Sequence, residues 1–259
     1  MKLEGRVSIV TGGGRGIGLA IALSFAAEGS AVVVSGTSKD ALDDAAERIR
    51  RQGGRALSLV ADVADEAHVR GLVEATIGEF GQIDILVNNA GIAGPTALVT
   101  DVNLEDWERT MGVNLTGAFL CAKHALPHMI KRRSGRIINI TSVAGLKGYA
   151  WRSPYCASKW GMIGLTRTIA EEAGRYDITC NAIAPGPISG PRIEQVIRSR
   201  AEQMNRTYEE VESDYVGPTA LKRMAEESDI AAMALFLASD EGRNLTGETL
   251  NISAGYKLS

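Results

Sequence analysis

Strand-like and helix-like segments alternate along most of this 259-residue chain, and the alternation limits the folds that it can adopt. The helix-like segments carry apolar residues three and four positions apart, as Leu42, Ala45, Ala46 and Ile49 do. The runs rich in β-branched and aliphatic residues that separate them lie at 7–10, 31–35, 56–60, 83–87, 136–141 and 178–184. Strands and helices in this order form a parallel sheet with helices on both faces. We therefore predict an α/β fold, a doubly wound parallel sheet.

The middle of the chain contains two long helical regions. The first is expected from about 104 to 133, with an interruption near Pro127. The second is expected to begin at Ser153 and Pro154, a capping hydroxyl followed by the residue suited to a first helical turn. We expect this second helix to end at Gly174, because glycine commonly terminates helices.

Residues 188–216 have a different character, since they are polar, rich in arginine and without a strand pattern. The segment is too long for an ordinary connection, so we expect it to be a substrate lid. A helix at 228–238 and a final strand at 249–252 follow it. With no internal repeat, linker or low-complexity tract, we expect one domain over residues 1–259.

Charge and cysteine content indicate which partners and which cellular compartment to expect. The 28 basic and 31 acidic residues give a formal net charge of −3, so neither nucleic acid nor a membrane surface is expected as a partner. Cys121, Cys156 and Cys180 are odd in number and widely spaced, which favours reduced thiols. We expect no signal peptide, and the apolar run at 231–238 is too short to cross a bilayer. We therefore expect a cytoplasmic protein.

A glycine-rich turn follows the first predicted strand. That strand stops at Thr11-Gly-Gly-Gly-Arg-Gly-Ile-Gly18, and a helical segment comes next. Glycines permit a tight turn, let the backbone approach a pyrophosphate and leave the amino end of a helix facing the negative charge. A flexible turn would also use glycine, but the strand, turn and helix order predicts a dinucleotide cofactor.

A tyrosine and a lysine four residues apart, Tyr155 and Lys159, carry the strongest candidate chemistry. On a helix such residues share one face. A free phenol has a pKa of about 10, and a positive charge at roughly 4 Å contributes about 4 kcal/mol at an effective dielectric of about 20, enough to lower that pKa by about three. The pair alone could also be an exposed helical pair. Its meaning depends on the rest of the chain.

Several short motifs occur in the order in which one protein family carries them. They are Thr11-Gly-x3-Gly16-x-Gly18, Asp62-Val63, Asn88-Asn-Ala-Gly91, Asn114, Ser142, Tyr155-x3-Lys159 and Pro185-Gly186. On these motifs the chain resembles the short-chain dehydrogenases/reductases in their single-domain form, from Thr11 to Gly255. It is also similar to 3-oxoacyl-carrier-protein reductases. The resemblance implies a Rossmann-like, doubly wound sheet in a single domain.

The resemblance also implies roles for four residues. Tyr155 would be the general acid in ketone reduction and the general base in alcohol oxidation, and Lys159 would lower its pKa and bind the nicotinamide ribose. Ser142 would hold the substrate oxygen, and Asn114 would support a water in the proton relay. Two alternatives remain: Ser142 could cap a turn after its strand, and Asn114 could satisfy backbone groups in its helix.

A larger set would bind the cofactor. The residues that the resemblance implies are Gly12, Arg15, Gly16, Ile17, Gly18, Thr37, Asp62, Val63, Asn89, Gly91, Tyr155, Lys159, Pro185, Gly186 and Ile188. Asp62 would face the adenine, although it could be a turn residue. The end of the second strand reads Ser35-Gly-Thr-Ser38, with no acid until Asp40 to bind ribose hydroxyls, and Arg15 could bind a ribose phosphate. We therefore expect NADP(H) in preference to NAD(H).

Other polar features offer weaker candidates. His124 and His128 have the spacing of a helical metal site, but no third ligand is evident, so we expect no metal. Cys156 has no partner base in view for a nucleophilic role. Trp151 could line the substrate pocket or pack in the core.

The carboxyl-terminal third adds candidates and departures from the family's pattern. Arg192, Arg198 or Arg200 could bind an anionic substrate, although solvated helix charges are the favoured interpretation. Ser189 could replace a threonine that the family often places near the cofactor amide, and Ser253-Ala-Gly255 replaces a more usual acidic triplet.

The resemblance thus implies an NAD(P)-dependent oxidoreductase that interconverts a secondary alcohol and a ketone. A homotetramer or homodimer would assemble through the middle helices and the last strand. Two alternatives remain, a dehydratase- or epimerase-type enzyme that retains its cofactor and a cofactor-binding protein without turnover.

Overall fold

Seven parallel strands form one sheet at the centre of the protein. The computed structural model describes residues 1–256, except for the side chain of Arg192. The strands are β1 (Val7–Thr11), β2 (Ala31–Gly36), β3 (Ala56–Val60), β4 (Ile85–Asn88), β5 (Gly135–Ile140), β6 (Ile178–Pro185) and β7 (Thr249–Ile252). Their order across the sheet is β3-β2-β1-β4-β5-β6-β7, and every neighbouring pair is parallel. The predicted doubly wound α/β fold is confirmed.

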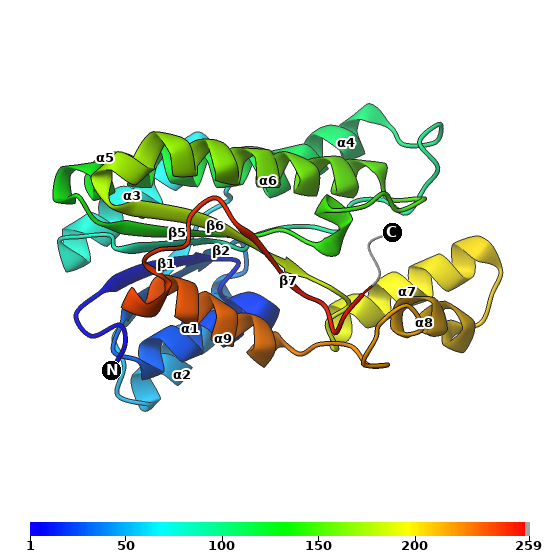
Figure 1. Cartoon of the computed structure of the whole chain (residues 1–259), viewed down its shortest axis with the longest axis horizontal. Helices are drawn as coiled ribbons and strands as arrows, with labels where there is room; N and C mark the ends of the chain where they lie inside the picture. The colour runs from blue at the N-terminus through cyan, green and yellow to red at the C-terminus, as the bar shows by residue number, and fades with distance from the viewer. Residues whose placement is uncertain (257–259) are drawn as a thin grey trace.

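Helices cover both faces of this sheet (Figure 1). One layer contains α1 (Gly16–Ala27), α2 (Lys39–Arg51) and α9 (Glu227–Ala238), and the other contains α3 (Glu66–Phe80), α4 (Leu104–Met111), α5 (Gly117–Arg132) and α6 (Ser153–Ala173). Each layer buries one apolar cluster, because successive strand residues point to opposite faces: Val10 packs toward α1 and α9, whereas Ile9 packs toward α3 and α5. Burying each such aliphatic side chain contributes about 1.5–3 kcal/mol.

The order of the strands also determines where a ligand can bind. The chain moves outward from β1 to β2 and β3, and then crosses to β4 on the other side of β1. The loops that leave β1 and β4 therefore diverge to opposite faces and open a crevice at the carboxyl edge of the sheet. Figure 1 shows α7 (Pro191–Met204) and α8 (Tyr208–Val216), in yellow and gold, at that same edge.

The long middle helix is irregular, but not where its proline predicts. Pro127 lies inside the continuous helix α5, and the irregular turn is a π-helical segment at Gly112–Thr116 between α4 and α5. Proline removes one backbone hydrogen bond, and here the buried neighbours Ala125 and Met129 keep the helix in place. The predicted interruption near Pro127 is therefore wrong. The wider turn carries Asn114, which is fully buried.

The start of α6 also differs from the prediction. Arg152 is the residue before the helix, and Ser153 already belongs to the first turn together with Pro154. From that position the Ser153 hydroxyl does not cap the helix, and its buried oxygen has no hydrogen-bond partner among the described residues. The predicted end of this helix at Gly174 is confirmed.

Within residues 188–216, for which the sequence predicted no strand, residues 191–204 and 208–216 form the two helices α7 and α8. Asn205 ends α7 with a left-handed conformation, and Thr207 begins α8 with a capping box to Glu210. The two helices share a small apolar cluster of Ile197, Ala201 and Val211, separate from the clusters on the sheet. No helix within residues 1–256 is long and apolar enough to cross a membrane.

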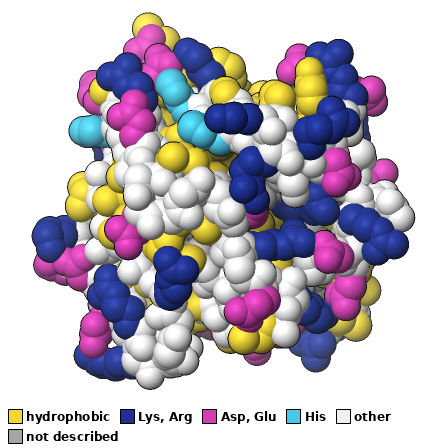
Figure 2. All heavy atoms as spheres, turned by 90° about the vertical axis from the view of Figure 1, so that its left-hand side faces the viewer, with side chains coloured by type: hydrophobic (Ala, Val, Ile, Leu, Met, Phe, Trp, Pro, Cys, Tyr) yellow, Lys and Arg dark blue, Asp and Glu magenta, His cyan; other side chains and the backbone are white. Residues whose placement is uncertain are grey.

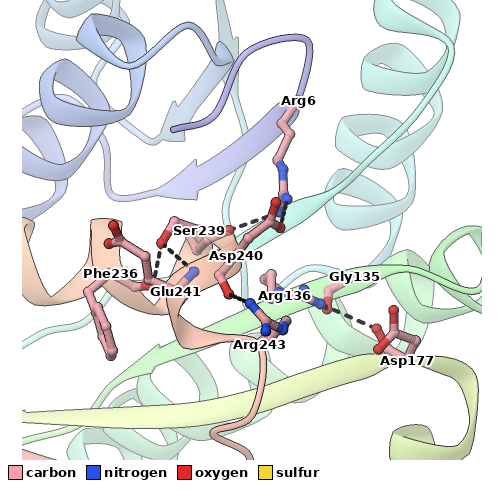
Figure 3. Close-up of polar contacts among 10 residues, drawn as sticks. Arg6, Gly135, Arg136, Asp177, Phe236, Ser239, Asp240, Glu241 and Arg243 are labelled. Atoms are coloured by element: carbon pink, nitrogen blue, oxygen red, sulfur yellow. Dashed lines mark hydrogen bonds and ion pairs between the residues drawn. The ribbon is translucent and has the colours of Figure 1, made fainter. Parts of the chain in front are cut away.

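Two arginines, Arg6 and Arg136, form polar contacts at the opposite edge of the sheet, where the strands begin (Figure 3). Arg6, just before β1, forms an ion pair with Asp240 and donates to the Ala238 carbonyl at the end of α9. Arg136 on β5 is 5% exposed and donates to the carbonyls of Gly135 and Asp177. Burial, reinforced by nearby Arg6, lowers the pKa of Arg136. On the surface at this end of the molecule, basic and acidic side chains are interspersed (Figure 2).

Candidate functional site

A cavity of about 690 Å³ lies at the carboxyl edge of the sheet. Segments that follow the six strands β1 to β6 line it, together with parts of α7 and α8. Among the residues that the sequence singled out, those that line it are Gly12, Arg15, Gly16, Ile17, Gly18, Thr37, Asp62, Val63, Asn89, Gly91, Ser142, Tyr155, Lys159, Pro185, Gly186 and Ile188. The structure therefore brings together the glycine turn and the residues of α6 that the sequence singled out. Asn114 is fully buried and does not line the cavity.

The glycine turn packs too closely for side chains. A Cβ on Gly18 would lie 2.2 Å from the Gly12 carbonyl oxygen and 2.5 Å from Asn89 Nδ2. Asn89 Nδ2 in turn donates to the carbonyls of Thr11 and Gly12 at 2.9 and 3.2 Å, which ties the end of β4 to this turn. No side chain caps the amino end of α1, where Arg15 is the preceding residue. Its first amides are therefore available to an anionic ligand.

The neighbouring strand ends contribute the other polar groups of this half of the cavity. No carboxylate stands on residues 35–38, at the end of β2 and just after it, and Arg15 is exposed at the rim. Asp62 lines the cavity after β3, while its Oδ1 accepts from the amide of Ala64 at 2.9 Å. Asp62 therefore both stabilises a turn and lines the cavity. Glu227, at the start of α9, also lines the cavity and was not predicted.

Tyr155 and Lys159 share the inward face of α6. Lys159 is 3% exposed, and its ammonium donates to the Ile140 carbonyl at 2.8 Å and lies 5.7 Å from the centroid of the Tyr155 ring. Thr141 Oγ1 donates back to the Lys159 carbonyl at 2.9 Å. A Cβ on Gly145 would lie 2.7 Å from that carbonyl oxygen, so glycine permits the close approach. The end of β5 thus holds the helix that carries the candidate pair.

Ser142 lies at the same strand end, with its side chain at the cavity. Its Oγ accepts a hydrogen bond of 3.1 Å from the amide of Ala144 and so caps a short 3-10 turn. This is the alternative that the sequence left open, and it leaves the hydroxyl proton available to a substrate oxygen. The cap therefore orients Ser142 without excluding the candidate role.

Asn114 connects the loop after β4 to α6. Its Oδ1 accepts from the Ile92 amide at 2.8 Å, and its Nδ2 donates to the Ile92 carbonyl and to Ser158 Oγ, both at 3.1 Å. Ser158 Oγ then donates to the Tyr155 carbonyl at 2.8 Å. Asn114 therefore satisfies backbone groups outside its own helix, and both donors of its amide are occupied.

Arg152 is a cavity residue that sequence reasoning missed. Its guanidinium carbon lies 5.1 Å from the centroid of the Tyr155 ring, and its Nη2 donates to the Ala93 carbonyl at 2.9 Å. Residues 93 and 152 are far apart in the chain, and only the fold places them together. The one available signal was its position immediately before the helix that carries Tyr155. Tyr149 and Tyr215 also line the cavity, and Tyr215 belongs to the segment 188–216 that was predicted as a substrate lid.

The weaker candidates have defined positions too. His124 Nε2 contacts Glu66 Oε1 at 3.0 Å, and the described residues contain no group of three or more potential metal ligands. Cys156 is buried, and desolvation raises the pKa of its thiol. Trp151 is not among the residues that line the cavity, whereas Ser189 is.

The lid arginines separate into different environments. The Arg198 guanidinium carbon lies 5.2 Å from the Tyr208 ring centroid, and that of Arg200 lies 5.9 Å from the Tyr215 ring centroid. The side chain of Arg192 lies outside the described part of the structure. In the terminal motif, Ser253 Oγ accepts from the amide of Tyr256 at 3.1 Å.

Comparison with known proteins agrees with this arrangement. The profile of the family described as short chain dehydrogenase matches residues 6–202. The chain belongs to the short-chain dehydrogenase family. This short-chain dehydrogenase is 37% identical to the 3-oxoacyl-(acyl-carrier-protein) reductase FabG of Thermotoga maritima over 259 residues, which cover 100% of both chains.

Two solved structures are similar to this short-chain dehydrogenase. NAD+-bound xylitol dehydrogenase superposes with a TM-score of 0.96 at 35% identity, over 98% of this chain and 100% of the other. A variant of actinorhodin polyketide ketoreductase with NADPH superposes with a TM-score of 0.92 at 32% identity, over 96% of each chain. The chain is thus an NAD(P)-dependent oxidoreductase that interconverts a secondary alcohol and a ketone.

The residues present fit such a cofactor. The glycine turn is compact, because a Cβ on Gly18 would collide with the Gly12 carbonyl, and it leads into the uncapped amino end of α1, as a pyrophosphate site requires. The cavity continues from there past Asp62 and Gly91 to Tyr155 and Lys159, so one extended ligand can contact both ends.

Proposed function

We propose that Tyr155 exchanges a proton with the substrate oxygen, with Ser142 binding that oxygen and Lys159 supporting both the phenol and the nicotinamide ribose. The observation that carries the proposal is the convergence of these three side chains on the cavity that also contains the glycine turn. Lys159 is positioned from two directions, by its bond to the Ile140 carbonyl and by the bond from Thr141 to its own carbonyl.

The chemistry follows from where charge develops. In ketone reduction negative charge grows on the carbonyl oxygen. The hydroxyl groups of Ser142 and Tyr155 are already positioned at the cavity and stabilise this charge by donating hydrogen bonds to it. Tyr155 then gives its proton to that oxygen, and in alcohol oxidation it takes the proton back. The bound nicotinamide cofactor supplies or accepts the hydride.

Asn114 has a supporting role in this proposal. Its amide holds the Ile92 backbone and, through Ser158, the carbonyl of Tyr155. A relay water would have to donate to an Asn114 oxygen, because both amide donors are used. In the proposed relay, Asn114 therefore acts as a hydrogen-bond acceptor for the water.

We also propose that NADP(H) is preferred to NAD(H). The absence of a carboxylate on residues 35–38 and the exposed Arg15 at the rim support a ribose phosphate rather than a free hydroxyl. Steady-state kinetics with both cofactors test the preference. Arg15→Gln should raise the KM for NADPH at least fivefold and leave that for NADH within twofold, and a wild-type enzyme that favours NADH would overturn the proposal.

The surroundings of the cavity support further parts of the proposal. We expect residues 1–259 to act as one cofactor-binding domain, with the segment 188–216 as a substrate lid. Ile193, Val196 and Tyr215 from this segment line the cavity. Hydrogen exchange of α7 and α8 should slow when cofactor and substrate are both bound, and unchanged exchange would argue against a lid.

Assembly is proposed through the helices of the middle region and the edge strand β7. Phe119 on α5 and Trp160 on α6 are 46% and 51% exposed, which is unusual for large apolar side chains on two helices of one layer. A homotetramer or homodimer would cover them, and Trp160→Arg should shift the mass measured by light scattering toward the monomer. The three free cysteines support a cytoplasmic location.

Two experiments test the central proposal. A panel of small secondary alcohols and ketones, followed by nicotinamide absorbance, identifies the substrate. Tyr155→Phe should then reduce turnover at least a thousandfold and leave the cofactor dissociation constant within threefold. Turnover that survives this substitution would overturn the assigned mechanism.

A further inference from the structure

Glu227 carries a negative charge into the part of the cavity that the glycine turn forms. It is the first residue of α9, which packs beside α1 on one face of the sheet (Figure 1). Its Oε1 lies 3.4 Å from where a Cβ on Gly16 would stand and 3.7 Å from where a Cβ on Gly190 would stand. Gly16 begins α1, and Gly190 is the residue before α7. The carboxylate therefore lies between the glycine turn and the start of the predicted lid.

The two glycines allow the carboxylate to come this close. Gly16 has a φ of 58° and Gly190 a φ of 136°, and both values favour a residue without a side chain. Because neither residue has a Cβ, no side chain separates Glu227 Oε1 from the backbone on either side. Glu227 is half-buried in this position and lines the cavity. Its charge is therefore held beside the turn instead of extending into solvent.

The acids around the start of α9 have different surroundings. The amide of Glu226 donates to Asp229 Oδ2 at 2.9 Å, and Ser228 Oγ donates to Glu226 Oε2 at 3.3 Å. These two acids therefore take part in the start of the helix itself. Within the part of the chain that the structure describes, the Glu227 side chain forms no hydrogen bond and no ion pair. Its charge is left to act on whatever occupies the cavity.

The ligand group that suits the glycine turn is itself an anion. A nicotinamide cofactor has a pyrophosphate, which the amino end of α1 attracts. A carboxylate beside the same turn repels that group, because like charges a few ångströms apart interact strongly at a partly buried site. Salt screens such a repulsion only in part, since the Debye length is about 10 Å at an ionic strength of about 0.1 M. One attractive and one repulsive feature thus act on the pyrophosphate together.

We propose that Glu227 weakens the binding of the cofactor pyrophosphate and thereby speeds the release of the cofactor. The inference does not depend on the choice between NAD(H) and NADP(H), because both contain the pyrophosphate. The alternative is a purely structural role, since an acid in the first turn stabilises a helix through the helix dipole. The contact of Oε1 with the backbone at Gly16, on a different helix, favours an effect on the ligand.

The test removes the charge and keeps the size of the side chain. Titration calorimetry measures the binding of NADH, NADPH and ADP-ribose to the wild type, Glu227→Gln and the control Glu226→Gln. ADP-ribose has the pyrophosphate but no nicotinamide, so it reports on the turn alone. Glu226 is the adjacent acid, is exposed and does not line the cavity. Its replacement by glutamine removes the same charge and keeps an oxygen that can accept from Ser228.

Glu227→Gln should bind all three ligands at least threefold more tightly than the wild type, and Glu226→Gln should bind them like the wild type. The gain should shrink when the ionic strength is raised from about 0.05 M to about 0.5 M, because salt screens the repulsion. Unchanged or weaker binding in Glu227→Gln, or equal gains in both variants, would overturn the inference. A gain with NADH and NADPH that is absent with ADP-ribose would also overturn it, because the effect would then lie at the nicotinamide.

Two further measurements separate release from helix stability. Displacement of bound NADPH by excess ADP-ribose, followed by stopped-flow fluorescence, should be at least twofold slower in Glu227→Gln than in the wild type. An unchanged dissociation rate would refute the effect on release. Thermal unfolding without ligand tests the structural role, which predicts a lower Tm in Glu227→Gln together with unchanged affinity for ADP-ribose. That combination would overturn the inference in favour of the structural role.

Discussion

The ammonium of Lys159 donates a hydrogen bond of 2.8 Å to the carbonyl of Ile140, the last residue of β5. This bond fixes the charged end of a flexible side chain at the strand end that leads to Ser142. It lies within the wall of the cavity, because Lys159 is 3% exposed. A lysine held in this way can act on two ligand groups without first losing much rotational freedom.

Replacing Lys159 by methionine should therefore damage two functions together. We expect turnover to fall at least a hundredfold and the cofactor dissociation constant to rise at least tenfold, because the ammonium would contact both the phenol and the ribose. Fluorescence titration with NADPH and steady-state kinetics measure the two effects. Tyr155→Phe is the matched control, since it should impair turnover alone, and a Lys159→Met variant with unchanged cofactor affinity would remove the ribose contact from the proposal.

Asn114 should contribute to stability as well as to the site. Asn114→Leu keeps a similar volume but leaves the amide and the carbonyl of Ile92 without partners. Leaving a buried polar group unpaired costs about 1–3 kcal/mol, so the free energy of unfolding should fall by roughly 2–4 kcal/mol. Urea denaturation measures the change. Asn114→Asp keeps the acceptor for the Ile92 amide and should lose less, and a fully stable leucine variant would contradict this account.

Replacing glycine by alanine should weaken cofactor binding at Gly18 but stabilise the protein at Gly71. Gly18→Ala places a Cβ 2.2 Å from the Gly12 carbonyl oxygen, so the turn must shift and cofactor binding should weaken at least tenfold. Gly71→Ala lies on α3, where an added Cβ meets nothing within 4 Å. It should stabilise the protein by about 0.5–1 kcal/mol, because alanine loses less backbone entropy in a helix. Similar cofactor affinity in the two variants would argue against a tight turn.

The three cysteines should be unreactive in the folded enzyme. All three are buried, and desolvation raises the pKa of each thiol, to about 12 for Cys121. The thiolate is the reactive form, so a disulfide reagent at pH 8 should label none of them until urea is added. Since these folded-state pKa values are raised, the stability they contribute is present below the ordinary thiol pKa and is lost as the pH rises toward 12. Rapid labelling of the native enzyme would show that a thiol is accessible.

Local patterns predicted most elements of the fold. The strands at 56–60 and 249–252 have the predicted bounds, and the helix through Tyr155 ends at Gly174. The alternation of the two periodicities also predicted the parallel sheet, because each period determines which face of an element is apolar. The errors at Pro127 and Ser153 concern single positions, where packing and the exact start of a helix outweigh residue preference.

The candidate site also has features that the sequence predicted and features that it did not. The spacing of Tyr155 and Lys159 predicted that both side chains share a helix face, and the glycine turn indicated where a pyrophosphate would lie. The Asn114–Ser158 connection and the position of Arg152 over the Tyr155 ring were not predictable. Spacing along one element determines direction within that element, whereas distances between elements depend on how helices and loops pack against the sheet. The sequence by itself therefore determined the fold class and the residues at the strand ends, and only the tertiary structure decided which of them meet.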